Sequence, residues 1–499
     1  MEYISKKRAR CRPDNSESSM LSIMERFEAN RGKSADDAGF YWSGGPVEVS
    51  SHTWFISNFS GITAFETEAG LVLVDSGTER LAPGLAAQLR KHTQAPVHTA
   101  IFTHGHLDHA YGLKSFLVPD QPRPRIVAQR AILDRFARYE RTAGLNAGIN
   151  ARQFGFAPGS QPGDLPSIFQ PPALMPDLLF DERVVLSAGE LTFEVSHCRG
   201  ETDDACWVWC PERRVVCSGD LVINAVPNAG NPQKVQRYPW DWADGLRAIA
   251  ACDAVSLCPG HGGPVVQDPM KVKRLVLETA DYLDSIVRQT LAAMNDGAPP
   301  HVDILHRVKL PETASPWLKP IYDEAEFIVR NVIRFYGGWW SGRPSELKPA
   351  SRAALAREIA TLCGGAAILL AREEALAEAG EMRLAGHLAD YALEAASRGR
   401  GGPRGRCRDL RETGRWRDEP DGREPVPCCG RYRAPTIAQR LTLNRTAGLR
   451  HGCGQSRVTA SGFCFPGPSL FGRFKSLFDR FNSLFDRLGN LVARSLRLQ

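Results

Sequence analysis

Residues 100–112 read AIFTHGHLDHAYG and place His104, His106, Asp108 and His109 within six residues, directly behind an apolar run. Side chains this polar are costly in a hydrophobic core unless they are paired. On a loop that follows a buried strand, they can instead point into a common cleft. Neutral imidazole and carboxylate are ligands that zinc takes in proteins. We interpret the stretch as part of a metal site, against the alternative of a solvated loop that is rich in histidine by chance.

The sequence around this loop predicts alternating strands and helices. The apolar runs GLVLVDSG at 70–77 and VHTAIFTH at 97–104 are typical of strands covered on both faces. Residues 79–93, between them, have helical spacing. This strand–helix–strand order indicates an α/β fold. Further strands are predicted at 125–129, 183–197, 205–219 (with a hairpin turn at 211–213) and 253–261.

Helical spacing dominates from Asp268 to Ser397, where the strand patterns stop. We therefore expect an α/β domain followed by a second domain that is all helical. The predicted organisation is an N-terminal extension at 1–40, the α/β domain at 41–267, the helical domain at 268–397 and a tail at 398–499.

The tail differs in composition and hydrophobic patterning from the rest of the chain. It begins with Arg-, Gly- and Pro-rich sequence without aliphatic periodicity, which predicts disorder. A repeat of seven follows at 474–492, and its apolar first, fourth and fifth places predict an amphipathic helix. That helix could dock on the body, self-associate or lie on a membrane surface. The abrupt loss of patterning also fits a shifted reading frame or fused unrelated coding sequence.

Bulk composition excludes several classes of protein. The net charge is +6, but the middle of the chain is near balance, so we expect no nucleic-acid surface on the core. We find no apolar run of about 18 residues that would predict a membrane-spanning helix. The basic N-terminus is not followed by the apolar stretch of a secretory signal. The 13 cysteines are scattered, which favours a reduced, cytoplasmic protein.

A pair of metal ions needs more ligands than residues 104–109 supply. His197, Asp220 and His261 each follow an apolar run, as the first four residues do. Taken singly, they could be a buried imidazole, a turn residue and a loop histidine. As a set they suggest two zinc ions, one bound by His104, His106 and His197 and the other by Asp108, His109 and His261, with Asp220 bridging both.

The HxHxDH run, the LVLVDSG strand and the later His, Asp and His resemble the metallo-β-lactamase superfamily of binuclear hydrolases. The resemblance implies an αββα sandwich with the metals at one edge of the two sheets. It also implies that Asp75 supports the metal loop from behind. Segments 200–242 and 322–350 are similar to the alkyl-sulfatase-related branch, in which the second segment belongs to a helical dimerisation domain. The resemblance covers residues 20–397 and implies a homodimer.

One difference from that branch bears on the substrate. Alkyl sulfatases carry glutamates where this chain has His197 and Asp220, so the chain keeps the more general superfamily ligand set. The resemblance therefore implies zinc-dependent hydrolysis of an ester-like bond, which could be a sulfate ester, a lactone, a thioester or a related group.

Two zinc ions would share a water molecule and lower its pKa, which gives a hydroxide nucleophile. Asp108 and the bridging Asp220 are the candidate catalytic residues, and Asp108 could orient the hydroxide or pass a proton. Asp203 and Asp204 are candidates to hold a ligand imidazole through its other nitrogen, or else are solvated carboxylates. The loop after Asp220 is either an ordinary Asn/Gly/Pro loop or a site for an anionic head group or oxyanion. Its candidate substrate-binding residues are Asn224, Asn228, Asn231, Lys234 and Arg237.

The expected partner is a small anionic or apolar substrate. Aromatic residues of the helical domain could wall the cleft, form the dimer contact or pack in a core; they are Phe335, Tyr336, Trp339 and Trp340. The alternative function is a non-catalytic scaffold with a degenerate hydrolase fold and a basic tail. The complete ligand set favours the enzyme, because a degenerate site is expected to have lost at least one ligand.

Overall fold

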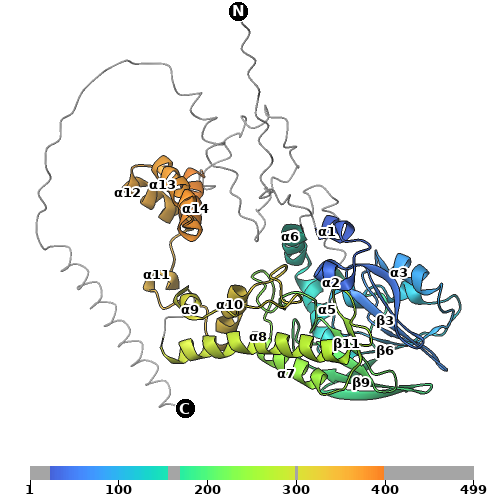
Figure 1. The fold of residues 1–499 in the computed structure, drawn as a ribbon. Coiled ribbons are helices and arrows are strands. Elements are labelled where there is room, and N and C mark those ends of the chain that lie inside the picture. The colour runs from blue at the N-terminus through green and yellow to red at the C-terminus, as the bar shows by residue number, and fades with distance from the viewer. Residues whose placement is uncertain (1–22, 155–168, 298–301, 398–499) are drawn as a thin grey trace, which may run out of the picture. The chain divides into compact units, whose positions relative to one another are not determined.

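The computed structural model describes residues 23–154, 169–297 and 302–397, and its strands form two sheets (Figure 1). The first sheet has seven strands in chain order: β1 (Gly44–Ser50), β2 (Thr53–Ser57), β3 (Gly61–Thr67), β4 (Gly70–Val74), β5 (Val97–Ile101), β6 (Arg125–Gln129) and β7 (Leu178–Phe180). Strands β1 to β4 pair antiparallel and β4 to β7 pair parallel. The carboxyl ends of β4 and β5 therefore share one edge, where Asp75 and the histidine-rich loop begin.

The second sheet has five strands: β8 (Arg183–Ala188), β9 (Leu191–His197), β10 (Cys206–Cys210), β11 (Val215–Gly219) and β12 (Ser256–Pro259). Only β11 and β12 pair parallel, so Asp220 and His261 follow strand ends at the same edge. This edge meets the loop edge of the first sheet, because the Cys206 amide donates to the Thr103 carbonyl at 2.8 Å. Gly61 donates likewise to the Gly260 carbonyl at 2.7 Å.

Three apolar layers separate the sheets from each other and from their helices. Alternate strand residues point to opposite faces. Val72 and Val74 of β4 thus pack against the second sheet, together with Phe193 and Val208. The opposite face of the first sheet packs on α3 and α5. The opposite face of the second sheet packs on α7 and α8 around the buried Trp242. The predicted αββα sandwich is confirmed.

The helices of the sandwich and its N-terminal side are α1 (Ile23–Ala29), α2 (Ala35–Ala38), α3 (Ala82–Leu89), α4 (Leu107–Ala110), α5 (Ile132–Arg141), α6 (Ala143–Phe154) and α7 (Pro239–Ala250). Those after the last strand are α8 (Pro269–Asn295), α9 (Val302–Arg307), α10 (Ala325–Tyr336), α11 (Pro344–Leu347), α12 (Arg352–Cys363), α13 (Ala366–Glu378) and α14 (Met382–Ala396). Short 3₁₀ helices cover Gly39–Tyr41 and Leu113–Phe116. Helix α8 begins where local chemistry favours a helix start. The Asp268 side chain is the N-cap and accepts the Lys271 amide, and Pro269 occupies the first helical position.

Strands are absent from the described residues after β12, so the predicted helical region is confirmed. The exact boundaries of the four predicted segments remain predictions. The predicted disorder, the seven-residue repeat and its helix lie in 398–499, outside the described residues. In the described part of the chain, no single helix is long and apolar enough to cross a membrane, although α12 and α13, bent at 86°, pass that test of length and composition as a pair.

Candidate metal centre

Asp75 organises the histidine-rich loop from the end of β4. Its backbone adopts a left-handed φ of 61°, which turns the carboxylate toward the loop after β5. One carboxylate oxygen accepts the Thr103 amide at 2.7 Å, and the other accepts the Thr103 hydroxyl at 2.7 Å. The second oxygen also lies 2.8 Å from Nδ1 of His109. Because Nδ1 is held in this way, Nε2 of His109 is the nitrogen left for a metal ion.

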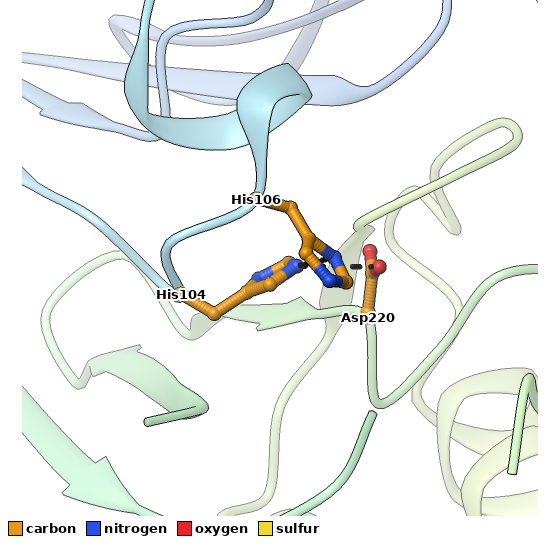
Figure 2. A group of neighbouring side chains, drawn as sticks. All are labelled: His104, His106 and Asp220. Carbon is orange, nitrogen blue, oxygen red and sulfur yellow. Dashed lines mark hydrogen bonds and ion pairs between the residues drawn. The ribbon is translucent and has the colours of Figure 1, made fainter. Parts of the chain in front are cut away.

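The first group of ligand atoms joins the loop to the end of β11 (Figure 2). Nε2 of His104 lies 2.8 Å from Nδ1 of His106 and 3.4 Å from Oδ2 of Asp220. His104 and Asp220 are buried, with 1% and 6% of their surfaces exposed. Two imidazoles and a carboxylate converging in a buried place fit the donor set of zinc.

The second group contains Asp108, His109 and His261. Oδ2 of Asp108 lies 3.5 Å from Nε2 of each histidine. Nδ1 of His261 donates to the Phe59 carbonyl at 2.8 Å, which leaves its Nε2 for a metal ion. The ring of Phe40 stacks on the His261 ring at a centroid distance of 5.2 Å, so the imidazole is held on its face as well.

Asp220 faces both groups at once. While its Oδ2 points to His104, its Oδ1 lies 3.2 Å from Nε2 of His109 and 3.5 Å from Nε2 of His261. Burial alone would raise the pKa of Asp220, but His109, His261 and His104 together hold it well below its usual value. Asp220 is therefore a carboxylate that reaches both candidate groups of ligand atoms.

Two buried atoms at the centre lack a well-formed hydrogen bond within the described residues: Nε2 of His109 and Oδ1 of Asp220. Buried polar atoms in native proteins are normally satisfied by a protein group, water or an ion. These two atoms face each other in a setting of imidazoles and carboxylates, and a metal ion would satisfy both. The residues present thus fit the implied metal pair.

His197 is not brought to either group, which corrects the predicted ligand set. As the last residue of β9 it pairs with Cys206 across the sheet. Its Nε2 donates to the Asp203 carbonyl at 2.9 Å, and its Nδ1 lies 3.9 Å from the exposed Glu182. The imidazole therefore contacts the turn between β9 and β10 and lies in neither candidate group of ligand atoms.

Glu201, on that same turn, lies beside the first group and was not among the predicted site residues. Its Oε1 lies 3.9 Å from Nδ1 of His106. The carboxylate is buried and accepts from Asn228 at 2.5 Å and from Arg237 at 3.2 Å. The available signal was the run GETDD directly after a predicted strand, but it offered several carboxylates and no means of choosing among them.

Most of the predicted substrate-binding residues are occupied by contacts within the protein. Asn224 donates to the His261 and Gly263 carbonyls and so holds the loop of a candidate ligand. Asn228 and Arg237 hold Glu201, and Asn231 accepts the Gln233 amide. These contacts favour a positioning role over direct substrate contact.

Lys234 has a different environment. Its Nζ donates to Asn150 of α6 at 2.8 Å. The pKa of Lys234 is lowered to about 8, chiefly by burial and also by Arg237, while Glu201 and Asp108 act in the opposite direction. Lys234 therefore lies close enough to interact electrostatically with both of these carboxylates.

Asp203 and Asp204 were candidates to hold a ligand imidazole, but their side chains have another partner in the structure. Both carboxylates pair with Arg135 of α5. Asp204 also accepts the backbone amide of Gly105, between two ligand histidines, at 2.7 Å.

The aromatic residues predicted to wall the cleft or form a contact are exposed, with Trp339 at 74% and Tyr336 at 50%.

Two family matches cover the sandwich and the helical region. Residues 54–261 match the metallo-β-lactamase superfamily, and residues 301–414 match the alkyl sulfatase dimerisation family. The chain is 28% identical over 350 residues to a linear primary-alkylsulfatase of Pseudomonas sp., with 66% of this chain and 65% of that protein covered. It is 24% identical over 350 residues to an alkyl/aryl-sulfatase of Saccharomyces cerevisiae, with 65% and 54% covered. The chain thus spans between about half and two thirds of the length of these relatives.

A solved structure shares the fold. The stereoselective inverting sec-alkylsulfatase of Pseudomonas sp. superposes with a TM-score of 0.64 at 18% sequence identity, over 74% of this chain and 64% of that one. At this level of identity the similarity concerns the fold alone.

Proposed function

We propose that the chain is a metal-dependent hydrolase of alkyl sulfate esters, because residues 54–261 match the metallo-β-lactamase superfamily and residues 301–414 match the alkyl sulfatase dimerisation family. The observation that carries the proposal is Asp220, whose two oxygens face two separate ligand groups. Two metal ions held close together are a common device for activating water at an ester. The relatives are alkyl sulfatases by name, and this favours sulfate esters over lactones and thioesters.

The proposed ligand set differs from the predicted one at a single position. We assign one zinc ion to His104, His106 and Glu201, the other to Asp108, His109 and His261, and place Asp220 between them. Glu201 takes the place predicted for His197. With a glutamate there, one of the two differences from the sulfatase ligand pattern disappears, and sulfate-ester hydrolysis gains support.

When bound, the two ions would supply a nucleophile from water near neutral pH and a Lewis acid for the ester. Asp108 is the least buried carboxylate of the ligand groups and is positioned to accept a proton from the attacking water. Lys234 offers a cation for the sulfate head group, and Asn150 holds its amine in place. Asn228 and Arg237 orient Glu201 by donating to Oε1, the oxygen that lies nearest His106.

A substrate panel tests the proposed activity. We expect the purified full-length protein to release sulfate from a primary alkyl sulfate and to turn over lactones, thioesters and phosphodiesters far more slowly. A chelator should abolish turnover, and added Zn²⁺ should restore it. Turnover that survives complete metal removal, or a lactone that is preferred over every alkyl sulfate, would contradict the proposal.

Protons compete with metal ions for these ligands. Burial raises the pKa of Glu201 to about 7 in the metal-free protein. Burial would lower the pKa of His109, but Asp220 and Asp108 outweigh it and raise that pKa well above the usual value. Both groups must lose their protons before they bind a metal ion. We therefore expect Zn²⁺ affinity to fall steadily from about pH 8 to about pH 6, measured by competition with a chromophoric chelator. An affinity that stays constant over this range would refute the assignment.

The proposal extends to a homodimer formed through the segment that matches the dimerisation family. Exposed aromatic residues at and after the end of α10 are candidates for its contact; they are Phe335, Tyr336, Trp339 and Trp340. A cytoplasmic location remains a prediction from the cysteine pattern.

A further inference from the structure

A buried ion pair lies directly behind the histidine-rich loop. Nε of Arg135 donates to Oδ1 of Asp204 at 2.6 Å, and the same guanidinium pairs with Asp203. Arg135 is 2% exposed and Asp204 is 1% exposed. Burying two charges carries a large desolvation cost, and a hydrophobic pair of similar volume is often as stable. Overall stability alone therefore does not account for an arginine and an aspartate at these positions.

The pair acts on the loop through one peptide group. Oδ2 of Asp204 accepts the Gly105 amide at 2.7 Å, and Gly105 stands between His104 and His106. The fit is close, because a Cβ added to Gly105 would lie 2.8 Å from Cδ of Arg135 and 2.9 Å from Ile132. Helix α5 thus confines the backbone that joins two ligand histidines.

The same pair also ties down the turn that carries Glu201. Arg135 contacts both Asp203 and Asp204, which follow Glu201 by two and three residues. His197 supports this turn from its other side through the Asp203 carbonyl. The three proposed ligands of the first ion that come from the loop and the turn are therefore fixed relative to one another by a single guanidinium.

We propose that Arg135 is a positioning residue for the first metal site: through Asp204 it fixes the Gly105 peptide, and with it the placement of His104, His106 and Glu201. The inference rests on the proposed metal binding, but its structural half concerns the metal-free protein. Groups that orient metal ligands from behind are typically worth about 10–100-fold in metal affinity. An effect of that size is expected here.

The test compares three full-length variants with the wild type. Arg135→Lys keeps the buried charge but loses the planar fork that bonds Asp204 and Asp203 together. The double variant Arg135→Met/Asp204→Asn removes both charges at once, so that no unpaired ion is left buried. Arg130→Lys is the matched control, because Arg130 pairs with Asp181 at 2.8 Å on the surface just before α5.

Two readouts separate positioning from general stability. Hydrogen exchange of the metal-free proteins should show faster exchange at the Gly105 amide in both Arg135 variants and not in Arg130→Lys. Titration with Co²⁺ should show affinity lowered by about 10–100-fold for one of two ions, with a changed absorption spectrum for that ion. Unfolding midpoints establish that each variant is folded.

A failure of the Arg135 positioning role can be distinguished from a failure of the proposed function. If the wild type binds no metal ion, the proposed function fails, and the exchange data still decide whether Arg135 holds the loop. If folded Arg135 variants keep wild-type protection at Gly105 and bind both ions as tightly as the wild type, the positioning role is wrong.

Discussion

Asp220→Asn is expected to lower kcat/KM for an alkyl sulfate by at least about a hundredfold and to reduce the bound metal below two ions per chain, since even groups that only support metal ligands are worth 10–100-fold. The reason is geometric: Asp220 is the residue that faces both groups, with Oδ2 toward His104 and Oδ1 toward His109. An amide keeps the shape of the side chain but removes the negative charge and one of the two oxygens. At most one of the two sites then keeps an oxygen ligand from this residue.

Steady-state kinetics and metal analysis after exhaustive dialysis measure this effect. Asp181→Asn is the matched control, because Asp181 is an exposed carboxylate that pairs with Arg130. We expect it to keep wild-type activity and metal content. Should Asp220→Asn retain two ions and wild-type turnover, the assignment of a shared carboxylate would have to be abandoned.

Glu201→Gln and His197→Gln are expected to differ sharply, although the two residues lie four positions apart. Glu201→Gln should cost at least about a hundredfold in kcat/KM and lower the affinity of one metal ion, since a neutral amide replaces a proposed ligand. His197→Gln should stay within about threefold of the wild type, because an amide can still donate to the Asp203 carbonyl, a bond worth about 1 kcal/mol.

Loss of folding must be excluded as a cause of lost activity in these two variants. Glu201 is buried beside Arg237, so its loss leaves that cation without its partner. Unfolding midpoints must therefore accompany the kinetics. The opposite ranking, with His197→Gln inactive and Glu201→Gln active and folded, would restore the ligand set first predicted from the sequence.

Six of the seven proposed ligands were predicted from the sequence, and the αββα sandwich was predicted from the family resemblance that their motifs carry. Apolar runs of strand length predicted the strands, and the residues directly after them were the candidates. His104 and His106 follow β5, Asp220 follows β11, and His261 follows β12. Since β4 and β5 are parallel, as are β11 and β12, their carboxyl ends meet at common edges of the sheets. Position along the chain was then enough to predict convergence.

Position after a parallel strand could not predict which side chain of the turn between β9 and β10 faces the candidate metal centre. It joins antiparallel strands and holds Glu201, Asp203 and Asp204 within a few residues of His197. Periodicity does not specify which side chain of an irregular turn points into a cleft, and histidine was the more familiar choice of ligand. The structure gives each residue different neighbours. Glu201 accepts from Asn228 and Arg237 and lies 3.9 Å from His106. Asp204 pairs with Arg135, and His197 donates to a backbone carbonyl.

The candidate strands, the helical region after Asp268 and the histidine-rich loop at 104–109 are visible as local patterns in the sequence. The choice of Glu201 as the proposed last ligand depends on contacts between distant segments, and so does the Arg135–Asp204 ion pair behind the loop. Asp204 meets Gly105 across 99 residues and Arg135 across 69. Such contacts depend on how α5 and the β9–β10 turn pack at the sheet edge, and only the tertiary structure contains that information, because packing places side chains that no local pattern relates.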